Sequence, residues 1–405
     1  MNVIFIEPAF PPNQREFVRG LAAAGATIVG IGERPVEHLA GELRTWMLHY
    51  HQVANVTDVG ALTDAVRWVQ RRIWVDRLEA TVEAHTMAAA HAREACGVPG
   101  TSVRTAYLCR DKPAMKEALR TAGVPTAAST AAHSANQVRE FAAQVGYPLI
   151  LKPRAGAGAS GTVRVESDAA LDAALAGFGE FESIAAEEFV EGHEGFYDTL
   201  SVDGEPIYDF VTHYYPNVLE AMRTRWISPQ FVTTNRVDTV ADYAQVRAMG
   251  RRVAQALGIG TSPTHLEWFF GPRGLRFSEI GCRPPGVRAW DLYGAANDID
   301  IYQEWANVIV HGHVGQRLSR RLAAGIVALR PDGDGHISHY DGVEEVQARF
   351  GEHILDVHLP APGTPTQPVD AGYMANAWVR MVHPDYDVLR AMLDGVGETL
   401  KVRAA

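Results

Sequence analysis

Two glutamates on opposite sides of a short turn are the clearest candidates for chemistry in this sequence. The stretch THLEWFFGPRGLRFSEIGCRPPG, residues 264–286, holds two β-type runs around Pro-Arg-Gly, a pattern typical of a tight hairpin turn closed by a left-handed glycine. In the register in which Gly271 faces Leu275, Glu267 lies directly opposite Glu279, and like charges so placed destabilise a sheet. A divalent cation removes that conflict, and Mg²⁺ prefers carboxylate oxygens together with substrate phosphates. The hairpin therefore predicts a metal site.

The residues around the two glutamates support this interpretation over an exposed hairpin with two tolerated acids. Phe269 and Phe277 are expected on the same face as the glutamates, which would make it a poor solvent face. Arg283 follows Glu279 by four residues, beside two prolines, and its planar fork suits a carboxylate or an acyl phosphate. The alternative is a surface arginine paired with a neighbouring acid. His265 fits a hydrogen-bonded strand histidine better than a site residue.

A glycine-rich loop preceded by a lysine is the second candidate. KPRAGAGASG, residues 152–161, contains G-x-G-x-x-G between two β-type runs, so it is the tip of a hairpin and not the strand-to-helix turn of a dinucleotide site. No Gly-Lys-Ser/Thr follows, and the H-R-D and D-F-G triplets of kinases do not occur. Backbone N–H groups without a Cβ can approach a triphosphate, while Lys152 supplies charge. A flexible surface hairpin is the alternative. The candidate phosphate contacts are Gly156, Gly158, Ser160 and Gly161.

Two further segments could complete a nucleotide and substrate site. AAEEFVEGHE, residues 185–194, is an apolar strand that carries two acids and then turns. The acidic side chains or backbone groups of this strand could bind an adenine edge, with a ribose hydroxyl beyond the turn, although solvated acids would look similar. The candidates are Glu187, Glu188, Val190 and Glu194. Residues 212–236 are aromatic and basic, and we expect Arg225, or alternatively Arg223, to reach a phosphate or a substrate carboxylate.

The elements that must position these residues alternate between strand and helix at the start of the chain. VIFIE and ATIVGIG flank a helical pattern, which predicts a parallel βαβ unit whose first turn lacks the usual glycine phosphate loop. Asp111 and Pro113 mark one helix start, and Ser134 with Gln137 forms a capping box at another. The end of the chain, from about residue 321, is rich in β-type runs.

Composition excludes several classes of protein. The 405 residues are 47% hydrophobic, enough for a large core, and a net charge of -11 argues against nucleic acid binding. No apolar run approaches the roughly 20 residues of a membrane span, and the start of the chain has no basic leader, so we expect a cytoplasmic protein. The three cysteines show no metal-binding or disulfide spacing, and Cys282 is more simply a packed thiol.

Taken together, these motifs resemble those of the ATP-grasp superfamily of carboxylate–amine ligases, in its amino-acid ligase and carnosine-synthase-like branch, related to biotin carboxylase. The resemblance covers nearly the whole chain and implies an α/β ATP-grasp fold. It implies a Rossmann-like domain over residues 1–110, an ATP-grasp domain over 111–320 with a lid (about 125–190) and a metal-binding lobe (about 191–320), and a β-rich piece over 321–405.

The resemblance also implies roles for individual residues. Lys112 and Lys152 match the two lysines that reach the nucleotide phosphates, and Arg283 matches the arginine of the E-I-N-x-R signature. The asparagine of that signature is Gly281 here, so one metal ligand is absent or replaced. The adenine contacts implied are Glu187, Glu188 and Val190, the ribose contact is Glu194, and the metal carboxylates are Glu267 and Glu279.

The function implied is that of an ADP-forming ligase that joins a small carboxylate, expected to be an amino acid, to an amine through an acyl phosphate. Its cofactors would be ATP and Mg²⁺, with Mn²⁺ as a substitute. Its partners would be the two small-molecule substrates, with no nucleic acid or membrane. A homodimer is a possible oligomeric state. Bicarbonate-dependent carboxylation, as in biotin carboxylase, and a catalytically inactive nucleotide-binding protein are the alternatives.

Overall fold

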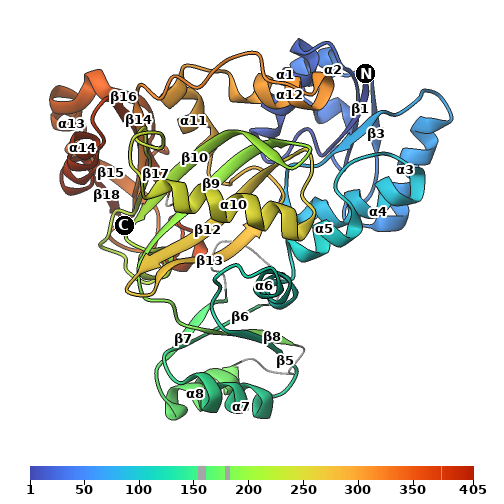
Figure 1. Cartoon of the computed structure of the whole chain (residues 1–405). Coiled ribbons are helices and arrows are strands. Elements are labelled where there is room, and N and C mark those ends of the chain that lie inside the picture. The colour runs from blue at the N-terminus through green and yellow to red at the C-terminus, as the bar shows by residue number, and fades with distance from the viewer. Residues whose placement is uncertain (154–160, 178–182, 375) are drawn as a thin grey trace.

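The computed structural model describes residues 1–153, 161–177, 183–374 and 376–405. The described residues form an α/β structure with three larger sheets and one short two-stranded ribbon, in agreement with the expected fold class. Figure 1 shows the N-terminal unit and the C-terminal helices on opposite sides of a central sheet, with a small lobe projecting below them.

The N-terminal unit is the parallel α/β structure that the sequence predicts. Its four strands pair in the order β3-β2-β1-β4, and β1 pairs in parallel with both β2 and β4. The strands are β1 (Asn2–Ile6), β2 (Thr27–Gly32), β3 (His49–Gln52) and β4 (Arg77–Glu79), and the helices are α1 (Gln14–Ala23), α2 (Gly41–Trp46), α3 (Val59–Gln70), α4 (Thr86–Cys96) and α5 (Val103–Leu108). A short 3₁₀ turn, η2 (Glu83–His85), follows β4, and its Glu83 pairs with Arg283.

The small lobe below the central sheet contains the residues for which a lid is predicted. Its antiparallel sheet has the order β5-β8-β6-β7. The elements are β5 (Ser129–Ala132), α7 (Ala135–Val145), β6 (Leu149–Pro153), β7 (Val163–Val165), α8 (Asp168–Gly177) and β8 (Ile184–Glu188). Leu149 pairs with Val165, so the glycine-rich segment joins two paired strands as predicted. The chain enters the lobe after α6 (Lys112–Thr121). The N-cap residue of this helix is Asp111, whose Oδ1 accepts a hydrogen bond from the Ala114 N–H at 3.0 Å.

The central sheet has eight strands, and it includes strands from the C-terminal part of the chain. Its order is β13-β12-β9-β10-β11-β14-β17-β16. The bounds are β9 (His193–Val202), β10 (Glu205–Tyr215), β11 (Gln230–Thr233), β12 (Ser262–Gly271), β13 (Gly274–Gly281), β14 (Ala323–Leu329), β16 (Ile354–His358) and β17 (Ala377–His383). The domain boundary expected near residue 320 therefore falls inside one continuous sheet, because β14 pairs directly with β11.

Helices cover both faces of the central sheet and tie the N-terminal unit to it. These helices are α9 (Val218–Ala221), α10 (Tyr243–Leu257), α11 (Ala289–Asn297), α12 (Ile301–His311), α13 (Val343–Phe350) and α14 (Tyr386–Thr399), and the ribbon pairs β15 (Ile337–Asp341) with β18 (Lys401–Ala404). Phe17 of α1 and Trp305 of α12 pack edge to face at 5.0 Å between ring centroids. A Cβ on Gly20 would lie 2.5 Å from the Tyr302 carbonyl oxygen, so the close approach of α1 and α12 requires glycine there.

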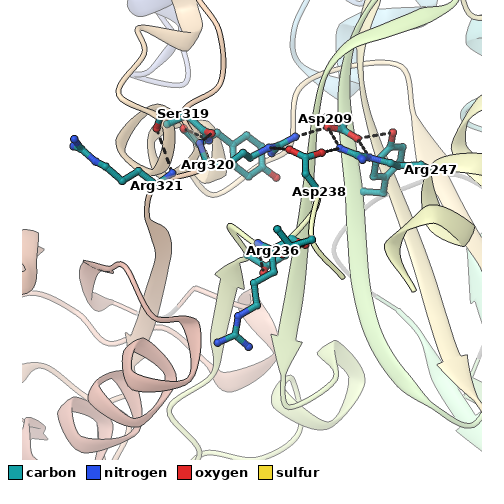
Figure 2. A network of polar contacts seen from close by, with 12 residues as sticks. Asp209, Arg236, Asp238, Arg247, Ser319, Arg320 and Arg321 are labelled. Carbon is teal, nitrogen blue, oxygen red and sulfur yellow. Dashed lines mark hydrogen bonds and ion pairs between the residues drawn. The ribbon is translucent and has the colours of Figure 1, made fainter. Parts of the chain in front are cut away.

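A ring of four charged side chains fastens the connection between α12 and β14 to this sheet (Figure 2). Arg247 of α10 and Arg320 each bind both Asp209 of β10 and Asp238, with Arg320 Nε 3.3 Å from an Asp238 oxygen. Figure 2 shows Arg236 pointing away from the ring, and it pairs with Asp387 instead. The alternation of signs lets the partly buried charges remain paired, and removing one arginine leaves two carboxylates to share the single arginine that remains.

We predict that Arg320→Met lowers the free energy of unfolding by about 2–3 kcal/mol, less than a fully buried pair would lose because Asp238 is half exposed. The matched control is Arg321→Met. The Arg320 side chain is 13% exposed, whereas that of Arg321 is 67% exposed and pairs with Asp298 at the surface. The control should change stability by less than about 0.5 kcal/mol in the same denaturant titration. Equal losses in the two variants would contradict this role for the ring.

Two histidines on neighbouring strands, His193 of β9 and His213 of β10, form a hydrogen-bonded chain on the face of the sheet that α10 covers, the same face that carries Asp209. His193 Nε2 lies 2.9 Å from His213 Nδ1, and His213 Nε2 lies 2.9 Å from the Tyr243 hydroxyl. Burial, together with the positive charges of neighbouring His193 and Arg390, lowers the pKa of His213 to about 3. Both ring nitrogens have partners when His213 is neutral, so protonation in the folded state is unfavourable.

The low pKa of His213 should make the fold sensitive to acid. Below about pH 6.5 the unfolded chain takes up a proton that the folded chain refuses until about pH 3, so stability falls as pH falls through 6.5. One such group contributes a slope of up to about 1.4 kcal/mol per pH unit. His213→Gln should flatten the dependence of unfolding free energy on pH between 6.5 and 5, whereas exposed His339→Gln should not. An unchanged slope in His213→Gln would contradict the assignment.

Candidate active site

A cavity of about 780 Å³ lies where the small lobe, the β12–β13 hairpin and the loops of the central sheet meet. Side chains of α6, β6 and β8 line it on the lobe side. The β12–β13 hairpin and residues 217–224, 283–289 and 371–373 line the remainder. Among the described residues, these walls bring together nearly all of the sequence-predicted site.

The two glutamates of the hairpin are opposed as predicted, but through a different register. Gly271 pairs with Gly274 and not with Leu275, so the turn is one residue shorter than expected. A one-residue bulge between the Trp268 and Glu267 pairs then places Glu267 opposite Glu279. Sequence alone did not reveal this bulge, because the shorter turn and the bulge each shift the register by one residue in opposite directions. Together they leave Glu267 opposite Glu279.

The bulge corrects a second expectation about the hairpin. Phe277 was expected on the face of the glutamates, but it is fully buried with Leu266 and Trp268 on the α10 side. Phe269 does line the cavity with the two acids. Phe269 and Phe277 both border the cavity, and Phe277 also packs into the core behind the hairpin.

Each glutamate of the pair contacts a cationic or hydrogen-bonding side chain. Lys112 Nζ lies 3.4 Å from Glu279 Oε2, and His265 Nε2 lies 3.5 Å from Glu267 Oε1. His265 also binds buried Asp198 at 2.8 Å through Nδ1. Burial lowers the pKa of His265, but the two carboxylates outweigh burial and raise it to about 9. His265 is therefore both a hydrogen-bonded strand histidine, as expected, and part of the cavity wall.

Two lysines converge on one buried glutamate in the lobe-side wall. Glu187 Oε2 lies 2.8 Å from Lys152 Nζ and 2.5 Å from Lys116 Nζ. Burial raises the pKa of Glu187, but the two lysines outweigh it and hold the pKa well below its usual range. Lys116 was not predicted from sequence. Its spacing of one helical turn from Lys112 on α6 was the available signal.

At the end of β8, the carboxylate of Glu188 is already paired with other protein groups. Glu188 accepts a hydrogen bond from the Ala128 N–H at 3.1 Å, and its other oxygen pairs with Arg273 at the tip of the β12–β13 hairpin. The side chain of Glu188 therefore fastens the lobe to the hairpin. Glu188 and Val190 both line the cavity.

Glu194 is buried in the cavity wall close to the acid pair. One of its oxygens accepts a hydrogen bond from the Val218 N–H at 2.7 Å. Burial, followed by repulsion from Glu267, raises the pKa of Glu194 to about 8. A carboxyl group that carries a proton near neutral pH can donate a hydrogen bond to a ligand oxygen.

Arg283 is held in place by the N-terminal unit. Its Nε lies 2.8 Å from an oxygen of Glu83 in η2, and its Nη1 donates to the Pro284 carbonyl oxygen at 2.8 Å. A Cβ on Gly281 would lie 3.2 Å from Glu83 Oε2. The Glu83 carboxylate therefore fills the space beside Gly281 into which the asparagine of the signature would project.

The structure separates the two arginines of residues 212–236. Arg225 binds Asp334 at 2.6 Å and the Pro331 carbonyl oxygen, and it is not among the residues that line the cavity. Arg223, the alternative, is exposed and does line it. The expectation for Arg225 is therefore corrected: Asp334 holds it away from the site.

Part of the glycine loop lies outside the described residues. This applies to Gly156, Gly158 and Ser160. Gly161 is described, is exposed, and has a φ of +68°. Among the described residues, no three metal-binding side chains gather at one point, so this part of the protein offers the cavity two opposed carboxylates and no full cage of ligands. No helix in the described residues is long and apolar enough to cross a membrane.

Comparisons with known proteins agree with this architecture. Residues 117–296 match the model of the ATP-grasp domain family. The L-arginine-specific L-amino acid ligase of Bacillus subtilis is 26% identical over 326 residues, which cover 78% of this chain and 76% of that protein.

Solved structures share the fold over the full chain at low sequence identity. The L-amino acid ligase from Bacillus licheniformis superposes with a TM-score of 0.79 at 18% identity, covering 100% of this chain and 98% of that one. N5-carboxyaminoimidazole ribonucleotide synthetase from Thermotoga maritima gives a TM-score of 0.71 at 16% identity, covering 100% and 99%.

Proposed function

We propose that this chain, whose residues 117–296 match the ATP-grasp domain family and which is similar to an amino acid ligase, joins the carboxylate of an amino acid to an amine, with release of ADP and phosphate. The observation that carries this proposal is the opposed pair Glu267 and Glu279 in a cavity that also holds three lysines. Similarity to the amino acid ligases supports the substrate class.

ATP would lie between the small lobe and the β12–β13 hairpin. Ala127 and Ile150 offer the base an apolar wall, and Val190 at the end of β8 offers its backbone. Lys112 and Lys152 would bind the phosphates, and Glu194 would face the ribose. The Glu188 side chain is engaged by Arg273, so we propose that Glu188 contributes to base binding through its backbone and not its carboxylate.

The donor set of the site fits Mg²⁺ bound together with phosphates. Glu267 and Glu279 would hold the ion, because Mg²⁺ commonly takes one or two protein carboxylates and completes its shell with phosphate oxygens and water. The bound ion would neutralise charge on the transferring phosphoryl group. The Glu83 carboxylate lies beside Gly281, where the signature has an asparagine. Because this carboxylate is already paired with Arg283, we do not propose it as a metal ligand.

The chemistry needs positioning and charge compensation more than a protein nucleophile. A carboxylate oxygen of the first substrate attacks the γ-phosphorus of ATP, forming an acyl phosphate and ADP. The amine then attacks the acyl carbon, the C–O bond to phosphate breaks, and the nitrogen loses a proton. Arg283 would stabilise the charge that develops at this centre, and Arg223 would receive a carboxylate of a substrate.

The direct test is a panel of amino acids and amines, scored by ADP release and by the mass of the product. We expect ADP release to require both an acid and an amine, and we expect Glu279→Gln to abolish turnover while the protein remains folded, because the acid pair can no longer balance the cation. The circular dichroism spectrum and unfolding midpoint provide the control for folding.

The same panel distinguishes the proposal from its alternatives. Turnover that needs bicarbonate and biotin but no amine would favour carboxylation, and nucleotide binding without turnover would favour an inactive protein. Activity of Glu279→Gln close to that of the unchanged protein would overturn the assignment of the acid pair.

Arg283→Lys should lower kcat far more than it weakens ATP binding. Lysine keeps the charge but cannot bind Glu83 through Nε and the Pro284 carbonyl through Nη1 while also presenting a planar donor to the reacting oxygens. A positioned charge-stabilising contact of this kind is typically worth about 3–4 kcal/mol, a loss of at least about a hundredfold in rate. Turnover within about threefold of the unchanged protein, at saturating substrates, would place Arg283 outside the reaction centre.

A further inference from the structure

Three buried charges form a cluster in the lobe-side wall of the cavity. Glu187 is 4% exposed and Lys116 is 1% exposed, and Lys152 binds the same carboxylate oxygen, Oε2. The second oxygen, Oε1, is buried and has no hydrogen-bond partner among the described residues. Lys116 and Lys152 therefore share one acceptor atom of a nearly buried carboxylate.

The two lysines differ in their position in the fold and in the exposure of their side chains to the cavity. Lys116 lies in the middle of α6, with its side chain enclosed. Lys152 stands near the end of β6, directly before the glycine-rich segment, and its side chain is 11% exposed to the cavity. Lys152 lines the same cavity as Glu267 and Glu279.

A lysine that binds a nucleotide phosphate must first give up its protein partner. If Lys152 moved alone from Glu187 to a phosphate, it would leave a carboxylate buried in the wall. A buried charge without a counter-ion is strongly unfavourable, and that free energy would be subtracted from nucleotide binding. Lys116 at 2.5 Å from the same oxygen prevents this, because it stays with Glu187 when Lys152 leaves.

We propose that Lys116 is a positioning residue, a resident counter-ion of Glu187 that frees Lys152 to bind the phosphates of the nucleotide. The proposal rests on the proposed function in one respect, that ATP occupies this cavity. It assigns Lys116 no contact with the nucleotide. In its absence, Glu187 holds Lys152 as its sole cationic partner among the described residues, and the phosphates compete poorly for it.

A double-mutant cycle tests this directly through the affinity for a non-hydrolysable ATP analogue with Mg²⁺, measured by calorimetry. Lys116→Met keeps the length of the side chain and removes its charge, and it should weaken binding at least about tenfold. Adding Glu187→Gln removes the charge that retains Lys152. Binding by Lys116→Met/Glu187→Gln should return to within about threefold of Glu187→Gln alone.

The chain offers a matched control one helical turn away. Lys112→Met also removes a cavity lysine of α6, but Lys112 pairs with Glu279 and not with Glu187. Glu187→Gln should therefore not restore binding to Lys112→Met. If Lys116→Met alone does not fold, the comparison of the double variant with Glu187→Gln still decides, because equal affinities are expected once Glu187 is neutral.

Three results would overturn the proposal. Binding by folded Lys116→Met equal to that of the unchanged protein would show that Lys152 does not need the counter-ion. A double variant as weak as Lys116→Met, with Glu187→Gln itself binding well, would mean that Lys116 touches the nucleotide. An unchanged protein that binds no nucleotide would remove the proposed function as well, whereas the first two results leave it standing.

Discussion

The charges in this cavity are stable because each buried group faces a group of opposite sign, and this requirement organises the rest of the site. Glu187 is held by two lysines, Glu279 faces Lys112, and Glu267 faces His265. Unpaired charges in such surroundings would shift their pKa values until they became neutral. Glu194 shows that outcome, because it has no ion-pair partner among the described residues, and burial, followed by repulsion from Glu267, raises its pKa to about 8. A nucleotide with its metal would bind in a cavity whose charged side chains are already paired, and binding would replace some of these ion pairs with contacts to the phosphates and the metal.

The fold supplies the opposed charges from three separate parts of the chain. The β12–β13 hairpin presents the acids, α6 and β6 present the lysines, and the N-terminal unit supplies Glu83 to hold Arg283. The hairpin itself is fixed from behind by buried Phe277 and at its tip by the pair between Arg273 and Glu188. Changes in the position of the small lobe are thus coupled to the strands that carry the acid pair.

The sequence predicted the parts of the site that follow from local rules. Strand and helix periodicity, helix caps and the alternation of side chains in a hairpin are short-range properties, so they led to the βαβ unit, to α6 beginning after Asp111, and to Glu267 opposite Glu279. The bulge beside Glu267 escaped prediction because it depends on how Phe277 packs against α10. The continuation of the central sheet into β14 also escaped, since strand pairing over a long stretch of chain leaves no local signal.

Side-chain partners were the least predictable feature, because they depend on residues distant in the sequence. Arg223 and Arg225 have the same charge and lie two residues apart, yet Asp334 holds Arg225 outside the cavity. Gly281 is a comparable case. Read within its motif it is a lost metal ligand, but in the fold it makes room for Glu83, which orients Arg283 from another part of the chain. A small residue in place of an asparagine therefore exchanges one polar contact near the acid pair for a different one, and the arginine at the reaction centre depends on the N-terminal unit for its position.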